Sequence, residues 1–366
     1  MSAAPPVDDP GSLTVEAAYE LFLDARAMEY TDETLRDYET RLRQFVEWAD
    51  DQGIDAIDDV TGWHLEQFRL YRQGQGLAAS TMKGQMQTIK VWLEYCADIG
   101  AVDEMLPYKV QVPTPDQHEL TSDVTLDADA AQAVIQHFRN ARVMYASEEH
   151  VALELAWFTG ARLGGLHSLD LGDYHSNEEY LQFKHRPPAT VLKKKLDGER
   201  AVEIPSEACD VLDTYIAEVR VDMRDDQGRD PLLVSTQGRP TTGTIRNWIY
   251  NATIPCRHSP CPHDKHPRRC EWTERNEAHH CPSSRSPHQV RTGSITWQLN
   301  QGLTYEEVAE RVNSDPDTLR RYYDKADDVE RMRRRDGLVD RLGFDEQSES
   351  PQDSNQRDSD SEPSDE

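Results

Sequence analysis

Apolar residues recur every three or four positions along the first hundred residues, and this spacing predicts amphipathic α-helices. We expect about four helices here, with Thr31 as the N-cap of the second, because its hydroxyl can accept a bond from a free N–H of the first turn. The expected helices cover Val15–Met28, the residues from the Thr31 cap through Asp50, Trp63–Gln73 and Ser80–Ile99. Each would bury one apolar face, with Trp63 and Trp92 in the core, so residues 13–100 are predicted to form a helical domain.

The pattern changes after residue 100. Residues 101–122 contain three prolines and are predicted to be an interdomain linker. Residues 123–342 then combine helical periods with strand-like pieces around an Asp197-Gly198 turn signal. The strand-like pieces are Tyr180–Lys184 and Ala201–Ile204. The fold is therefore predicted to be mainly α with a small antiparallel sheet, and the second domain to be mixed α/β.

The two ends of the chain have compositions that bury too little apolar surface to fold. Residues 1–12 are polar and rich in proline, and residues 343–366 consist mostly of Ser, Asp, Glu, Gln and Pro. Both are predicted to be disordered. The N-terminus lacks a signal-peptide pattern, and no apolar run approaches the roughly 20 residues of a membrane span, so we expect a cytoplasmic protein with no membrane partner.

Charge is the feature that argues most against a nucleic-acid partner. The chain has 40 Lys+Arg against 68 Asp+Glu, a net charge of −28, whereas DNA-binding proteins are usually basic. Such acidity fits either a protein that avoids DNA or one adapted to a very salty cytoplasm. We favour a halophile, because acids are spread over helix surfaces while lysine is scarce. For a protein with roughly eight phosphate contacts, a roughly thirtyfold rise in salt would lower the electrostatic part of its DNA affinity by about ten orders of magnitude. Such a protein would rely on base contacts, shape and apolar burial.

An anion site is predicted where Ser286 and Pro287 begin a helix. They are a good N-cap and first-turn pair, which places His288 and Arg291 on one face beside free backbone N–H groups. Arg162, far upstream, supplies a second planar guanidinium. Two arginines would stabilise the extra charge of a pentacoordinate phosphoryl transition state.

Two more residues would complete a strand-transfer reaction. Tyr322 could attack phosphorus, although a tyrosine with a reference pKa near 10 needs a neighbouring base or positive field to ionise. Lys195, in a lysine-rich turn, could give a proton to the leaving 5′ oxygen, and no metal is needed. Each feature alone has an ordinary explanation as a solvated surface group, but their order and separations are far more specific.

In this order the residues resemble the tyrosine recombinase (phage-integrase) family, including the Xer-type recombinases, over residues 13–330. Arg162 matches the family's first arginine motif, and Lys195 matches its hairpin lysine. His288 and Arg291 match its second box. The resemblance implies that residues 13–100 are a core-binding domain, which clamps DNA together with a catalytic domain.

The nucleophile has two candidate residues, and the chain departs from the family pattern at two positions. Tyr322 fits by its spacing from Asn313, and Tyr323 is the adjacent alternative. Asn313 stands where the family most often has histidine, and its amide could donate a hydrogen bond but could not shuttle a proton. Gly165 stands where many relatives carry an acidic residue.

The resemblance implies a site-specific recombinase or integrase that forms a 3′-phosphotyrosyl intermediate without a catalytic cofactor. It also implies a homo-tetramer on double-stranded DNA with an inverted-repeat site, and hence a nucleoid-associated protein. One alternative is a catalytically impaired DNA-binding regulator derived from a recombinase. The other is a nicking and resealing enzyme similar to type IB topoisomerases.

A Cys/His-rich insertion at residues 256–281 predicts a metal. Its cysteines are Cys256, Cys261, Cys270 and Cys281. Tetrahedral sulfur ligation by zinc could order a segment this poor in apolar residues, with His263 as an alternative ligand. Unliganded loop cysteines or a redox-labile patch are the competing interpretations. Because the insertion ends just before Ser286, we expect the zinc to be structural and not catalytic.

Overall fold

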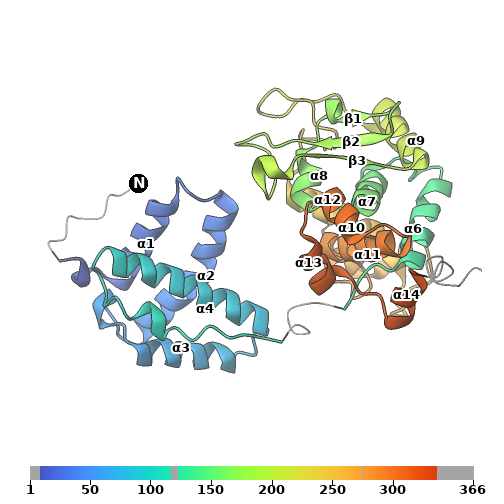
Figure 1. Cartoon of the computed structure of the whole chain (residues 1–366). Coiled ribbons are helices and arrows are strands. Elements are labelled where there is room, and N and C mark those ends of the chain that lie inside the picture. The colour runs from blue at the N-terminus through green and yellow to red at the C-terminus, as the bar shows by residue number, and fades with distance from the viewer. Residues whose placement is uncertain (1–8, 117–122, 275, 336–366) are drawn as a thin grey trace, which may run out of the picture. The chain divides into compact units, whose positions relative to one another are not determined.

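The computed structural model describes residues 9–116, 123–274 and 276–335, and the chain divides between Asp123 and Val124 into two compact units (Figure 1). The predicted disordered tail at 343–366, most of the predicted disordered N-terminus and the end of the predicted linker lie outside these residues. The proposed domain boundaries as a whole therefore stay predictions.

The first unit is a bundle of the four expected helices. They are α1 (Val15–Arg26), α2 (Asp32–Asp51), α3 (Gly62–Gly74) and α4 (Ala79–Asp98). The ring of Phe45 lies at the centre, 5.1 Å from Phe68 and 5.7 Å from Trp92 in edge-to-face contacts. Trp92 is fully buried as predicted. Trp63 is 65% exposed in the first turn of α3, so the prediction that it belongs to the core is wrong.

Part of the predicted linker belongs to the core of this unit. Ala101, Val102, Leu106 and Val110 are buried with the helices, and Pro107–Lys109 form a 3-10 turn. At the other end, Pro10–Ser12 form a capped 3-10 turn. Order thus extends beyond the predicted limits on both sides, because short apolar stretches next to the prolines pack on the bundle.

The second unit is built around α7 (Glu148–Thr159), which is buried along almost its whole length. It packs against α6 (Ala128–Asn140), α10 (Thr242–Thr253) and α11 (Pro287–Asn300). The shorter helices are α8 (Leu163–Ser168), α9 (Ser206–Thr214), α12 (Tyr305–Val312), α13 (Pro316–Thr318) and α14 (Asp328–Arg333). Figure 1 shows the sheet on one side of α7 and α11 on the other.

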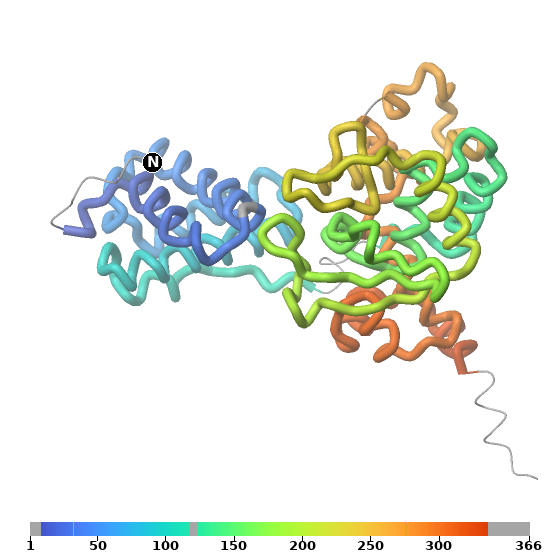
Figure 2. The backbone as a smooth tube through the Cα atoms, turned by 90° about the horizontal axis from the view of Figure 1, so that it is seen from above, coloured from blue at the N-terminus to red at the C-terminus, as the bar shows by residue number. Residues whose placement is uncertain are grey.

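Three short strands form an antiparallel sheet. They are β1 (Tyr174–His175), β2 (Tyr180–Phe183) and β3 (Arg200–Glu203), in the order β1-β2-β3. Leu181 pairs with Val202 and Phe183 with Arg200, and the three apolar side chains are fully buried. Since side chains alternate along a strand, Arg200 lies on the buried face with Val202. The path between β2 and β3 can be followed in Figure 2. The predicted fold class, mainly α with a small antiparallel sheet, is confirmed.

A glycine turn at the end of α7 brings distant segments together. Gly160 has a left-handed backbone with φ +56°. A Cβ added there would lie 2.8 Å from Cγ1 of Val312 in α12. Glycine therefore satisfies both the conformation and the close approach of α12. The turn leads directly into Arg162 at the start of α8.

Across the residues that the structure describes, the helices lack the combined length and hydrophobicity of a bilayer span.

Candidate active site

The first turn of α11 forms as the sequence predicts. Ser286 caps the helix in a reciprocal capping box with Gln289, and Pro287 occupies the first turn. Arg291 is only 1% exposed. Its Nη1 donates hydrogen bonds to the carbonyls of Gly160 and, at 2.9 Å, Val312. Within the described chain its Nε and Nη2 have no hydrogen-bond partner, so half of the guanidinium is left for a ligand.

Arg291 belongs to a cluster of arginines that no carboxylate neutralises among the described residues. Arg162 donates through Nη1 to the Asn313 carbonyl. Arg200 donates through Nε to the Arg311 carbonyl at 2.6 Å, and its guanidinium lies 4.1 Å from the ring centroid of Phe183.

Burial and the neighbouring positive charges disfavour the charged form of each guanidinium, so the pKa values of Arg200 and Arg291 fall. Burial lowers the pKa of Arg200 to about 9, and the charges of Arg291 and Arg162 contribute. Burial, followed by the charge of Arg162, lowers the pKa of Arg291 to about 10, while Tyr323 partly opposes the shift. An anion placed here would relieve both desolvation and repulsion, so the cluster is suited to a phosphate.

Sequence reasoning missed Arg200. The available signal was its place directly before the predicted strand Ala201–Ile204 and two residues before Val202, on the face that alternation would bury. A charged residue on such a face needs a special environment, and that environment is the arginine cluster.

His288 lies at the mouth of this cluster. Its side chain reaches the surface, but the surrounding protein partly desolvates the imidazole and so lowers its pKa. The charges of Arg291, Arg162 and Lys193 lower the pKa further. A lowered pKa keeps the imidazole neutral near pH 7. Its ring centroid lies 5.4 Å from that of Tyr323.

The structure brings Tyr323, and not Tyr322, beside the predicted His–Arg pair. Both belong to a π-helical turn, Leu319–Tyr323. The Arg291 guanidinium carbon lies 5.2 Å from the Tyr323 ring centroid, and Tyr323 is buried. Tyr322 is half-buried and packs on the apolar cluster that contains Ile295.

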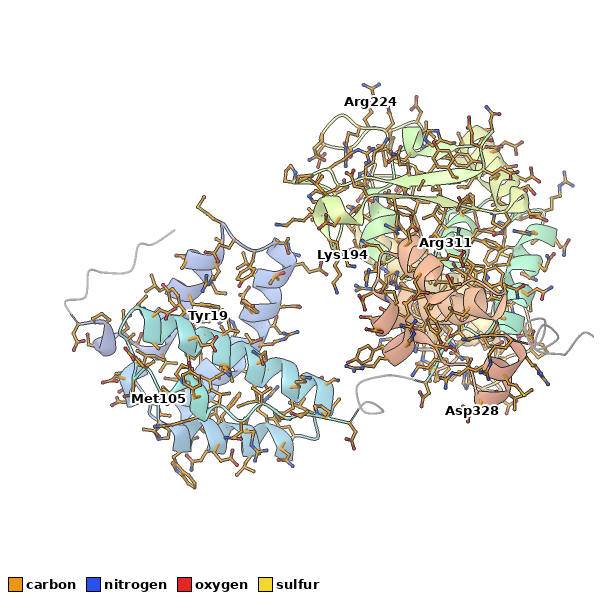
Figure 3. All side chains as sticks on the ribbon, viewed as in Figure 1. Tyr19, Met105, Lys194, Arg224, Arg311 and Asp328 are labelled. Atoms are coloured by element: carbon orange, nitrogen blue, oxygen red, sulfur yellow. The ribbon has the colours of Figure 1, made fainter. Side chains whose placement is uncertain are left out.

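The lysine turn reaches the cluster through its first two lysines. Lys194, labelled in Figure 3, donates from Nζ to the Ser314 carbonyl at 3.1 Å. Lys193 lies close enough to influence His288. Lys195 is exposed and begins a 3-10 turn with φ +53°.

The two departures from the family pattern have structural settings of their own. Gly165 is buried, and an added Cβ would lie 3.5 Å from Ala161 and from the Phe183 ring, so the position is closely packed. Asn313 is the C-cap of α12, with φ +52°.

The four cysteines of the insertion are free and lie near one another. Cys270 and Cys281 are buried. Burial raises the pKa of Cys256, and the charges of the other three cysteines add to the rise. However, among the described residues, which omit position 275, no three His, Cys, Asp or Glu side chains are arranged to hold a metal ion. The predicted alternative ligand His263 pairs instead with the Ser283 hydroxyl at 3.0 Å. The arrangement of these side chains does not support the predicted zinc site.

Comparisons with known proteins give one family match for the first unit and relatives of similar sequence or fold. Residues 20–98 match the family described as "Phage integrase, N-terminal SAM-like domain". Tyrosine recombinase XerC 2 of Ralstonia nicotianae is 24% identical over 234 residues, which cover 62% of this chain and 63% of that protein. The match thus spans less than two thirds of the relative's length.

Two solved structures are similar in fold. The Tn1549 transposon integrase in complex with transposon right end DNA is 16% identical with a TM-score of 0.65, over 90% of this chain and 99% of that one. A lambda integrase tetramer bound to a Holliday junction is 16% identical with a TM-score of 0.59, over 87% and 79%. At these identities the likeness shows the fold alone: a SAM-like N-terminal domain followed by an integrase-type catalytic domain.

Proposed function

We propose that the chain is a tyrosine recombinase of the phage-integrase type, a site-specific recombinase that cuts and rejoins DNA through a 3′-phosphotyrosyl intermediate; the match of residues 20–98 and the similarity to tyrosine recombinase XerC 2 support this proposal. The observation that carries this proposal is the arginine cluster beside Tyr323. The described chain gives its three guanidiniums no carboxylate, and Arg291 keeps Nε and Nη2 without a partner. Such a site favours a phosphate whose negative charge increases in the transition state.

In the proposed reaction, Arg162 and Arg291 bind the non-bridging oxygens of the scissile phosphate, with Arg200 adding positive field. A tyrosine oxygen attacks phosphorus, the new O–P bond forms, and the bond to the 5′ oxygen breaks. Neutral His288 is placed to accept the tyrosine proton. A lysine of the turn, Lys195 by resemblance, gives a proton to the leaving 5′ oxygen.

Sequence spacing and side-chain contacts favour different tyrosines as the nucleophile. Its spacing from Asn313 favours Tyr322. Contact with Arg291 and His288 favours Tyr323, since a neighbouring guanidinium stabilises a tyrosinate. We adopt Tyr323 as the proposed nucleophile.

The proposed partners follow the relatives. The compared lambda integrase is a tetramer on a Holliday junction, and we assign this chain a homo-tetramer on an inverted-repeat DNA site. Residues 13–100 would be the core-binding domain and residues 123–342 the catalytic domain. The net charge of −28 leads us to propose that binding takes place on the nucleoid of a cell with high internal salt.

Covalent trapping tests the function. Nicked suicide duplexes made from inverted repeats that flank the gene would be incubated with the full chain at low to molar KCl. We expect a covalent protein–DNA adduct on a denaturing gel, retained at molar KCl. No adduct at any salt concentration would favour the regulator derived from a recombinase. Relaxation of plasmids that lack the repeats would favour a topoisomerase.

We also propose a structural zinc for the insertion, whose four free cysteines lie near one another; because the described side chains are not arranged around a metal position, binding would have to rearrange them. Titration of the full chain with Co²⁺ is expected to give a thiolate-to-metal absorption band at one ion per chain, because four thiolates from one segment can close a tetrahedral shell. Cys270→Ser should remove the band and His263→Ala should keep it. A wild-type chain without the band would exclude this zinc site.

A further inference from the structure

Four cationic side chains converge on four consecutive backbone carbonyls at the C-terminal end of α12. Arg200 donates to the carbonyl of Arg311 at 2.6 Å, Arg291 to Val312 at 2.9 Å, Arg162 to Asn313, and Lys194 to Ser314 at 3.1 Å. The donors come from β3, from α11, from the residue before α8 and from the lysine turn. These segments are far apart in the sequence, so this helix end is where the cluster is assembled.

A helix C-terminus is a suitable place for such an assembly. The last carbonyls of a helix have no partner within it and carry the negative end of the helix dipole. They therefore attract and orient guanidiniums. A carboxylate would orient them as well, but it would neutralise the charge that a phosphate needs. Carbonyl acceptors leave the full positive charge of Arg162 and Arg291 available to an incoming anion.

The carbonyls point at the cations because α12 ends abruptly at Asn313. Asn313 has φ +52° and ψ 63°, its N–H bonds to the Glu310 carbonyl at 3.2 Å, and the Ser314 N–H bonds to the Ala309 carbonyl at 2.9 Å. This is a left-handed helix cap, which asparagine adopts far more readily than alanine.

The side chain of Asn313 is committed to the lysine turn. A Cβ added to Gly198 would lie 2.6 Å from Asn313 Nδ2, so the amide packs directly on the turn that follows Lys195. The amide thus contacts the protein, whereas the backbone of the same residue holds Arg162.

We propose that Asn313 is a positioning residue whose left-handed backbone ends α12 so that the carbonyls of residues 311–314 hold the arginines and Lys194 around a phosphate. The inference rests on the proposed strand-transfer function and deepens it. It gives position 313 a backbone role, where the resemblance suggested a side-chain hydrogen bond to a phosphoryl oxygen.

Two substitutions separate the roles. Asn313→Gly removes the amide but keeps the left-handed cap, and we expect adduct formation within about twofold of wild type. Asn313→Ala also removes the amide but disfavours the cap, and we expect about a tenfold slower adduct formation. Asn276→Ala is the matched control, because Asn276 has the same conformation (φ +67°) outside the arginine cluster. It should leave the rate unchanged.

Equal losses in Asn313→Gly and Asn313→Ala would overturn the inference, because the amide itself would then be required. A second readout does not depend on cleavage. Millimolar inorganic phosphate should raise the thermal unfolding midpoint of wild type and of Asn313→Gly equally, and of Asn313→Ala less.

The two readouts distinguish the failures. If wild type forms no adduct but phosphate discriminates the variants as expected, the proposed function fails and the role of Asn313 stands. If wild type forms the adduct but Asn313→Gly behaves like Asn313→Ala in both adduct formation and the phosphate-induced midpoint shift, only the proposed role of Asn313 fails. A wild-type midpoint that phosphate does not raise also contradicts the inference.

Discussion

Tyr323→Phe is expected to abolish the covalent adduct with a suicide DNA substrate, whereas Tyr322→Phe should keep it. The phenylalanine ring can fill the same buried space but has no oxygen to bond to phosphorus. Tyr323 is the tyrosine whose ring lies 5.2 Å from the Arg291 guanidinium carbon and 5.4 Å from the His288 ring. The measurement is the fraction of DNA that migrates with protein on a denaturing gel.

The two variants control for each other, since the same hydroxyl is removed from adjacent residues of one π-helical turn. Loss of the adduct in Tyr322→Phe alone would show that the spacing from Asn313 identifies the nucleophile. It would also require the turn to rotate when DNA binds. Retention in both variants would point to attack by another residue.

Arg291→Lys is expected to slow adduct formation by about a hundred- to a thousandfold, comparable to the loss of one donor that stabilises a transition-state oxyanion. The guanidinium of Arg291 holds the Gly160 and Val312 carbonyls with Nη1 and leaves Nε and Nη2 for a ligand. A lysine ammonium has a similar charge but lacks this planar fork. Single-turnover rates at saturating DNA would measure the effect.

Arg320→Lys is a suitable control. Arg320 belongs to the turn Leu319–Tyr323, is exposed, and pairs with Asp317 and Glu306. We expect its rate to stay within about twofold of wild type, as exposed ion pairs contribute little. An Arg291→Lys enzyme as fast as this control would mean that only positive charge matters at the site. Normal unfolding curves for both variants would assign the difference to the reaction and not to the fold.

The arginine cluster has a structural cost that the proposed function would explain. Burial and repulsion lower the pKa of Arg291 to about 10 and that of Arg200 to about 9. Buried charges normally pair with opposite charges. Here carbonyls at the end of α12 orient the cations and leave their charge unneutralised, and under the proposed function a DNA phosphate would supply the counter-ion.

Local features of the structure could be read from the sequence, because backbone geometry fixes their periods. The spacing of apolar residues predicted the four helices of the first unit, and strand-like pieces around the Asp197-Gly198 turn signal predicted β2 and β3. The Ser286-Pro287 start of α11 followed from cap chemistry. These features depend on neighbours a few residues away, so no knowledge of the tertiary fold is needed.

The choice between Tyr322 and Tyr323 needed the tertiary structure. Adjacent residues of a helical turn point in different directions, and only the packing of the turn Leu319–Tyr323 on α11 decides which of them meets Arg291. The exposure of Trp63 could not be predicted from the sequence either. The helical period shows which residues share a face of the helix but not whether another element covers that face.

The sequence by itself determined which residue types the chain offers for phosphoryl transfer: two arginines, a histidine, a lysine turn and a tyrosine pair. The tertiary structure decided what holds them together. Arg200 joins from β3, and the carbonyls of residues 311–314 orient the cations. Every residue has a backbone carbonyl, so no sequence pattern marks those that act, and their role depends on where α12 ends in space.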